Sequence, residues 1–236
     1  MNHGCLYLIP VPLGADSANA SFTTFLQETI NQIDEYIVEN EKTARKFLKQ
    51  AGLKIPQSEL TIHDYGKHKR STTSTKDYFK GLLAGKDVGL MSEAGCPGIA
   101  DPGADIIAYA HKLGIKVVPL VGPSSIMLAL MASGFNGQRF TFHGYLPIDK
   151  EQRRRQLLAA EQNAARYQET QIFIETPFRN NALLENILKI CNDQTKLCVA
   201  CNLTAEDELI ISDTVKEWKK RKVDFHKKPA IFLLYR

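Results

Sequence analysis

The first half of the chain alternates short β-rich runs with helical patterns, and this order constrains the fold more than any other feature. Four apolar runs are predicted as strands, at residues 5–11, 35–39, 87–91 and 115–121. Residues 21–33 carry apolar side chains at helical spacing, and residues 40–50 lie between a helix start signal, Asn40, and a stop signal, Gly52. This β-α-β order predicts a mainly parallel α/β sheet with flanking helices.

The second half of the chain has more strands and fewer helices. Strands are predicted at residues 139–147, 170–177, 196–204, 208–215 and 230–236, with two long helical patterns among them. Very few residues separate 196–204 from 208–215, which favours antiparallel pairing. We therefore predict two α/β domains, residues 1–121 with a mainly parallel sheet and residues 122–236 with a mixed sheet. The boundary is expected near Val121–Pro123.

Composition excludes several classes of protein. The apolar stretches are too short to span a bilayer, so no membrane partner is expected. The N-terminus has no basic region before its apolar residues, so it is interpreted as a first strand and not as a signal peptide. Five cysteines without the spacing of a secreted domain indicate a reducing cytoplasm.

Residues 92–103, SEAGCPGIADPG, follow a predicted strand and contain three glycines and two prolines. Open α/β sheets bind ligands beyond the carboxyl ends of their strands. Glycine lets the backbone approach a ligand closely, and proline reduces the entropy lost on ordering. A tight strand-to-helix connection needs only ~2–6 residues, so this length indicates a binding loop. The run matches neither the dinucleotide motif nor the phosphate-loop motif, so a phosphate is not its obvious ligand.

Three further loops of small residues follow predicted strands, at residues 10–16, 121–125 and 144–147. Each of them alone is compatible with an ordinary turn. Four such loops in one chain indicate a cleft lined by backbone amides and carbonyls. Such a cleft suits an uncharged, adenosine-like ligand better than a phosphate.

A run of motifs carries a family resemblance: LYLIPVPLGA, IVENEKTARKFL, SEAGCPGIADPG, GPSS, FTFHGYLP, IETPFR and CNLT. In this order they resemble the tetrapyrrole methylase family, the class III S-adenosylmethionine-dependent methyltransferases. Within it, the chain is most similar to the bacterial enzymes that methylate a cytidine ribose 2′-hydroxyl of small-subunit rRNA. The resemblance implies two α/β domains with the cofactor, S-adenosylmethionine, in the cleft between them, and a homodimer.

Matched motif by motif, the resemblance also implies a set of cofactor-binding residues in these loops and near the C-terminus. They are Pro12, Ala15, Ser92, Glu93, Ala94, Gly95, Cys96, Ile99, Ser124, Ser125, Tyr145, Leu146, Asn202, Leu203, Pro229 and Ala230.

Two charged motifs depart from the rRNA enzymes. Residues 39–42 read Glu-Asn-Glu-Lys where those enzymes have an acidic-Thr-Arg run after a glutamate. Residues 201–205 read Cys-Asn-Leu-Thr-Ala where they have Arg-Glu-Leu-Thr-Lys. Both positions are expected to face the substrate, so these departures point to a divergent paralogue with a different acceptor.

No catalytic constellation can be assigned. A ribose hydroxyl is a poor nucleophile and needs a general base, whereas an electron-rich tetrapyrrole carbon needs less help. The weak candidates for a base are Glu39, His63, Asp64 and Glu175. A lone His-Asp pair such as His63-Asp64 is more often structural than catalytic.

Positive charge is clustered, although the net charge is only +4, at residues 67–70, 150–155, 216–222 and 227–228. Such runs fit solvated helix faces and an anionic partner about equally well. Arg153, Arg154 and Arg155 open a helical segment, and we predict that they bind RNA phosphates. Successive residues point around a helix, so one or two contacts are realistic.

Cys198 and Cys201 lie inside a strand pattern with no second pair and no nearby histidine, so core cysteines and no metal are predicted.

Three functions remain open. The first is methylation of rRNA, free or in the small ribosomal subunit, at a ribose 2′-hydroxyl. The second is methylation of a small acceptor such as a corrin or porphyrin precursor, which the altered charged motifs favour. The third is cofactor binding without catalysis.

Overall fold

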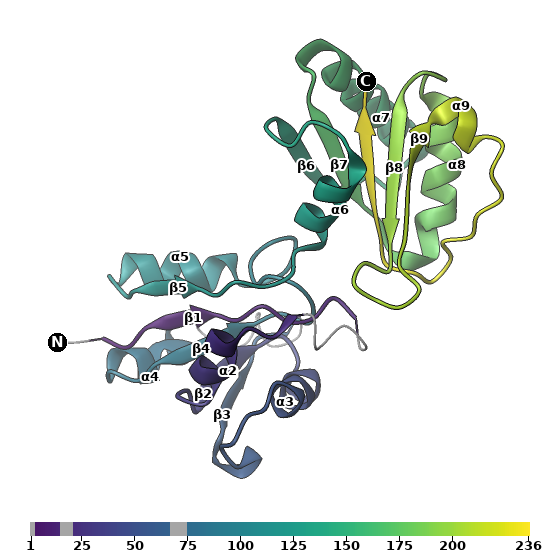
Figure 1. The fold of residues 1–236 in the computed structure, drawn as a ribbon. Coiled ribbons are helices and arrows are strands. Elements are labelled where there is room, and N and C mark those ends of the chain that lie inside the picture. Colours follow the sequence, from purple (N-terminus) through teal and green to yellow (C-terminus); the bar gives the residue numbers. More distant parts are fainter. Residues whose placement is uncertain (1–2, 15–20, 67–74) are drawn as a thin grey trace. The chain divides into compact units, whose positions relative to one another are not determined.

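A computed structural model describes residues 3–14, 21–66 and 75–236 (Figure 1). The chain divides into two compact units, Met1–Ser124 and Ser125–Arg236, and the predicted boundary near Val121–Pro123 lies next to this division. The implied cofactor residue Ala15 and the basic run at residues 67–70 lie outside the described residues.

The first unit contains a five-stranded sheet in which every pairing is parallel, as predicted. Its strand order is β3-β2-β4-β1-β5. The strands are β1 (Leu6–Leu8), β2 (Glu35–Val38), β3 (Thr61–Asp64), β4 (Val88–Met91) and β5 (Val117–Pro119). The sequence analysis missed β3, a partly exposed edge strand with the sequence TIHD, because it lacks the apolar run that marks the other strands.

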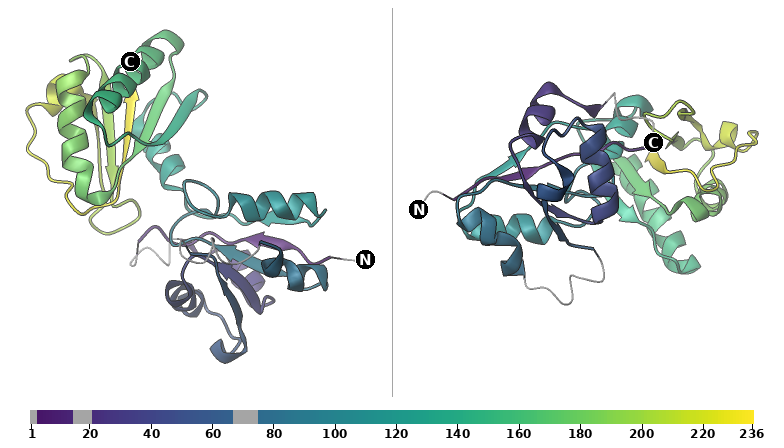
Figure 2. Two further views of the ribbon diagram at one scale, coloured as in Figure 1. Left: turned by 180° about the vertical axis from the view of Figure 1, so that it is seen from behind. Right: turned by 90° about the horizontal axis from the view of Figure 1, so that it is seen from below.

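Helices cover both faces of this sheet (Figures 1 and 2). Along β2, Tyr36 and Val38 belong to one hydrophobic cluster and Ile37 to another, as expected for side chains that alternate between faces. The first cluster includes Leu26 and Phe47 from the helices α2 and α3. The helices are α2 (Thr24–Ile30), α3 (Glu41–Gln50), α4 (Lys80–Leu83) and α5 (Ala104–Lys112), with 3-10 turns η1 (Gln57–Glu59) and η2 (Thr75–Phe79).

The helix predicted from Asn40 to Gln50 is confirmed by its caps. The Asn40 side chain accepts hydrogen bonds from the backbone N–H groups of Lys42 (3.0 Å) and Thr43 (3.3 Å), which satisfies amides at the start of α3 that have no partner inside the helix. Gly52, beyond the end of α3, has a positive φ of 88°, a conformation that glycine adopts without strain.

The second unit contains a mixed sheet of order β6-β7-β10-β8-β9. β6 and β7 are parallel, and the other pairings are antiparallel, including the predicted pair β8 and β9. The strands are β6 (Phe140–Tyr145), β7 (Thr170–Ile174), β8 (Lys196–Cys201), β9 (Leu209–Thr214) and β10 (Ala230–Tyr235). The carboxyl ends of β6, β7 and β8 therefore share one edge with the start of β10.

The helices of the second unit are α6 (Ser125–Ser133), α7 (Lys150–Tyr167), α8 (Asn180–Ile190) and α9 (Val215–Trp218), with the 3-10 turn η3 (Pro177–Arg179). Figure 1 shows α6 on one face of the sheet, with α7 and α8 on the other. Leu157 of α7 and Leu184 of α8 pack with Phe232 of β10 and Trp218 in a single core. Burial of these side chains supplies the main driving force for the fold.

Candidate functional site

Three loops of the first unit follow the adjacent strands β1, β4 and β5, and they are bound to one another. We call residues 9–14, 92–103 and 120–124 the three-loop platform. Val11 and Gly95 exchange two backbone hydrogen bonds of 2.9 Å each, and the Cys96 thiol lies 3.4 Å from the Pro123 carbonyl oxygen. The loops beyond three neighbouring parallel strands therefore form one connected surface.

Glycines let these loops approach one another closely. A Cβ added to Gly122 would lie 2.1 Å from Cγ of Pro10, so only glycine fits there without a shift. Gly95 is buried and has a φ of 68°, which is unfavourable for other residues. The glycines predicted to form a binding loop thus have a clear physical reason for being glycine.

The implied cofactor residues of this unit that the structure describes lie on the platform. Ser92 is buried and donates a hydrogen bond of 3.1 Å to the Ala94 carbonyl oxygen. Pro12 is half-buried, and Ser124 ends the third loop. Ile99 is 50% exposed, so it offers an apolar surface among backbone groups. Their role in cofactor binding stays a prediction.

A carboxylate that the sequence analysis missed lies at the same sheet edge. Asp101 is half-buried, and its pKa is raised to about 6 by burial and then by the negative charges of Glu39 and Glu93. Glu39 directly follows β2, and Glu93 accepts a hydrogen bond of 3.2 Å from the Thr43 hydroxyl. The sequence gives a weak signal for this cluster of three carboxylates, because Glu39, Glu93 and Asp101 all follow predicted strands.

The implied residues of the second unit also lie along one sheet edge. Tyr145 and Leu146 are at the end of β6, Asn202 and Leu203 follow β8, and Pro229 and Ala230 are at the start of β10. The Asn202 N–H donates to the Pro229 carbonyl oxygen at 3.0 Å. Tyr145 is 57% exposed. The strand order brings these separated segments together, whereas Ser125 begins α6.

Glu175, a candidate base, is occupied by a structural ion pair. Its side chain is 2% exposed, and both carboxylate oxygens accept hydrogen bonds from Nη2 of Arg179, at 2.7 and 2.6 Å. Oε1 also accepts from the Thr176 N–H at 2.6 Å. These bonds hold the 3-10 turn η3 onto the end of β7, which favours a positioning role for Glu175.

His63 and Asp64, two further candidates, also have structural partners. His63 Nε2 lies 2.9 Å from Oε1 of Glu35, a buried residue at the start of β2. Asp64 accepts a hydrogen bond of 2.8 Å from the Gly66 N–H. Of the four candidates, Glu39 lies near Asp101 of the three-loop platform, and it forms no ion pair among the described residues. No observation assigns the base.

The three predicted phosphate-binding arginines differ in their surroundings. Arg153 folds back, and its Nη1 donates to the carbonyl oxygens of Pro147 (3.2 Å) and Ile148 (2.9 Å). Arg154 and Arg155 are exposed and form no ion pair within the described residues. The geometry therefore leaves Arg154 and Arg155 free to meet an anion, and it gives Arg153 the task of holding the loop before α7.

Among the described residues, no group of His, Cys, Asp and Glu could hold a metal ion, and Cys198 and Cys201 are free and buried. None of the helices in the described part of the chain is long and apolar enough to cross a membrane.

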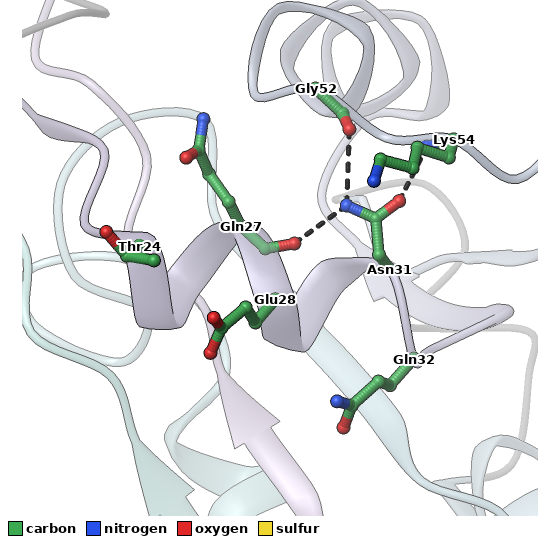
Figure 3. A pocket seen from close by; sticks show the side chains of 7 residues that line it. All are labelled: Thr24, Gln27, Glu28, Asn31, Gln32, Gly52 and Lys54. Carbon is green, nitrogen blue, oxygen red and sulfur yellow. Dashed lines mark hydrogen bonds between the residues drawn. The ribbon is translucent and has the colours of Figure 1, made fainter.

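An open surface pocket of about 450 Å³ lies on α2 (Figure 3). Asn31 donates to the carbonyl oxygens of Gln27 (2.7 Å) and Gly52 (3.2 Å) and accepts from the Lys54 N–H (2.6 Å). These bonds tie α2 to the segment after α3, which is a structural role. The lining residues are Thr24, Gln27, Glu28, Asn31, Gln32, Gly52 and Lys54, and none of them belongs to the three-loop platform.

Comparisons with known proteins agree with this arrangement. Residues 6–219 match the sequence model of the family described as Tetrapyrrole (Corrin/Porphyrin) Methylases. The chain is 33% identical over 205 residues to the Ribosomal RNA small subunit methyltransferase I of Synechocystis sp., covering 87% of this chain and 69% of that protein. The protein of the same name from Bacillus subtilis is 32% identical over 215 residues, covering 91% and 68%.

The Escherichia coli O157:H7 protein of that name is 30% identical over 216 residues, covering 92% of this chain and 71% of its own. Among solved structures, the methyltransferase CobJ matches with a TM-score of 0.63 and 15% identity, covering 99% of this chain and 94% of that one. At this identity the match shows a shared fold.

Proposed function

Because the chain belongs to the tetrapyrrole methylase family, we propose that it transfers a methyl group from S-adenosylmethionine to a ribose 2′-hydroxyl of ribosomal RNA. The chain is a methyltransferase, and its family implies a methyl donor. One observation carries the choice of acceptor. Relatives at 30–33% identity over about nine-tenths of the chain bear the name of small-subunit rRNA methyltransferases.

The residues of the three-loop platform fit the proposed donor. The close approach of Gly122 to Pro10 and the positive φ of Gly95 let the three loops pack into one preformed surface. Ile99 and Val121, 50% and 78% exposed, offer apolar surface to an adenine ring. The nearby carboxylates of Glu93 and Asp101 can accept hydrogen bonds from amino or hydroxyl groups. The implied contacts of the second unit remain part of the proposal.

The bound donor supplies an activated methyl group on a sulfonium sulfur. The protein's residues then have two tasks, to hold the acceptor in line with that methyl group and to exclude water. A rigid platform suits the first task, because little ordering entropy is lost when a ligand binds to preformed loops. The ribose hydroxyl also needs a proton acceptor, and Glu39 is the candidate whose position supports this role best.

The experiment is transfer of an isotopically labelled methyl group from the donor. Acceptors are small ribosomal subunits from a strain lacking this gene, and separately a corrin precursor. Labelled rRNA in which one phosphodiester bond has become resistant to alkaline cleavage would support ribose methylation. Label in the corrin precursor alone would contradict the rRNA assignment. It would support the small-acceptor function, which the altered motif that begins at Cys201 favours. Label in neither acceptor would support binding without catalysis.

The proposal includes a homodimer in the cytoplasm, on the family resemblance. Light scattering at micromolar concentration should give twice the mass of one chain, which is 26.4 kDa. A mass of one chain would contradict the dimer and leave the enzymatic proposal untouched.

A further inference from the structure

Phe178 is a strongly exposed aromatic residue at the sheet edge of the second unit that carries the implied cofactor residues. It lies in η3, the turn that follows β7, and it is 68% exposed. The same sheet edge carries Tyr145, which is 57% exposed. An exposed aromatic ring lacks the stabilisation that burial would give it. Its position beside implied ligand-binding residues therefore favours a ligand that covers it.

One cationic and one aromatic side chain contact this ring. Nζ of Lys227 lies over it, 6.0 Å from its centroid, and the ring of His226 meets it edge-on at 5.9 Å. Lys227 forms no ion pair among the described residues. Lys228, its neighbour, is only loosely paired, with its Nζ 3.9 Å from Asp207. The aromatic surface is therefore flanked by the positive charge of Lys227, which no ion pair within the described residues neutralises.

The ring and the lysine are held in place before any ligand arrives. Arg179 N–H donates to the Thr176 carbonyl oxygen at 2.8 Å, and the Glu175–Arg179 ion pair fixes the same turn. Lys227 donates its N–H to the Pro177 carbonyl oxygen at 2.9 Å and has a φ of 61°. Two segments distant in sequence are thus locked together at Phe178. A rigid aromatic group loses little entropy when it binds a ligand.

Topology adds further positive charge at this edge. β6 and β7 are parallel neighbours, so the end of β6 and the start of α7 lie at the same end of the sheet as η3. Arg154 and Arg155 are exposed in the first turns of α7. Exposed rings alternating with unpaired cations are typical of surfaces that bind single-stranded nucleic acid.

We propose that Phe178 is a stacking platform for an unpaired RNA base, with Lys227 facing the adjacent phosphate. This inference rests on the proposed rRNA substrate and adds a recognition subsite to it. Every base has a flat face that can stack on Phe178, so this subsite contributes affinity with little sequence preference. A protein partner would need a larger continuous apolar patch than one ring flanked by a lysine.

The test measures binding of a fluorescent single-stranded RNA of about 10 nucleotides to the full chain. Phe178→Ala should weaken binding roughly tenfold or more, because stacking on the ring is lost, whereas Phe178→Trp should preserve it. Lys227→Gln should reduce the dependence of affinity on salt, which Phe178→Ala should leave unchanged. The matched control is Phe25→Ala, which removes a ring that is 58% exposed on α2 and should bind as wild type.

Three outcomes separate the inference from the proposed function. Wild-type affinity of Phe178→Ala in a chain that binds and methylates RNA would overturn the stacking subsite alone. Equal losses in Phe178→Ala and Phe25→Ala would also overturn it. A wild-type chain that methylates only the corrin precursor and binds no RNA would overturn both.

Discussion

Val11 and Gly95 exchange both of their backbone hydrogen bonds, each 2.9 Å long, and so join the loop after β1 to the loop after β4. The loop after β5 is attached to both, through Gly122 against Pro10 and through Cys96 against Pro123. A substitution that displaces one loop should therefore also displace the other two. This coupling is the basis of the first prediction.

Gly122→Ala should destabilise the first unit. The new Cβ would lie 2.1 Å from Cγ of Pro10, and overpacking of this kind typically costs about 1–3 kcal/mol. Urea unfolding measures the loss. Gly137→Ala is the control, because nothing lies within 4 Å of its added Cβ, and it should change stability by less than about 0.5 kcal/mol. Equal stability of the two variants would mean that the loops do not constrain one another.

Asp101→Asn should stabilise the protein at neutral pH. Burial and the charges of Glu39 and Glu93 raise the pKa of Asp101 from 3.8 to about 6. The folded state thus binds more protons than the unfolded state between these values, and stability falls as pH rises through this window. The variant lacks this penalty, which we expect to be on the order of 1 kcal/mol after solvent screening.

The measurement is urea unfolding of wild type and Asp101→Asn at about pH 4 and about pH 7.5. The difference in stability should grow with pH. A difference that is constant across this range would show that Asp101 does not titrate abnormally.

Arg154 and Arg155 should contribute to RNA affinity through phosphate contacts, whereas Arg153 should not. Each lost contact should lower the slope of log affinity against log salt by roughly one. The double variant Arg154→Ala/Arg155→Ala should therefore show a flatter slope with unchanged donor binding. Arg153→Ala, the matched control, should keep the wild-type slope, because Arg153 is engaged with the Pro147 and Ile148 carbonyl oxygens. Identical slopes for all three proteins would make this cluster a solvated helix face.

Much of the fold was predictable from local signals. Apolar runs and helix caps such as Asn40 specify elements through interactions between near neighbours in sequence. The glycine- and proline-rich composition of residues 92–103 predicted a long loop after β4, and the role of this loop in binding stays a prediction. β3 was not predicted, because its short TIHD sequence carries no strand signal of its own and forms a strand by pairing with β2.

The properties of several site residues depend on distant partners and could not be predicted. Asp101 owes its raised pKa to burial together with Glu39, which follows a different strand. Arg153 resembles its two neighbours in sequence, and only the path of the loop before α7 distinguishes it. The proposed role of Phe178 depends on its contact with Lys227, which belongs to the segment before β10 and is far from Phe178 in sequence.

Donor binding by two glycine variants tests the role of the three-loop platform most directly. Gly95 and Gly114 have similar φ angles of 68° and 70°, so replacing either with leucine imposes a similar backbone cost of about 1–2 kcal/mol. Only Gly95 belongs to the platform. Calorimetry with S-adenosylhomocysteine should show strongly reduced affinity for folded Gly95→Leu and wild-type affinity for Gly114→Leu. Wild-type affinity of a folded Gly95→Leu variant would contradict donor binding at the platform.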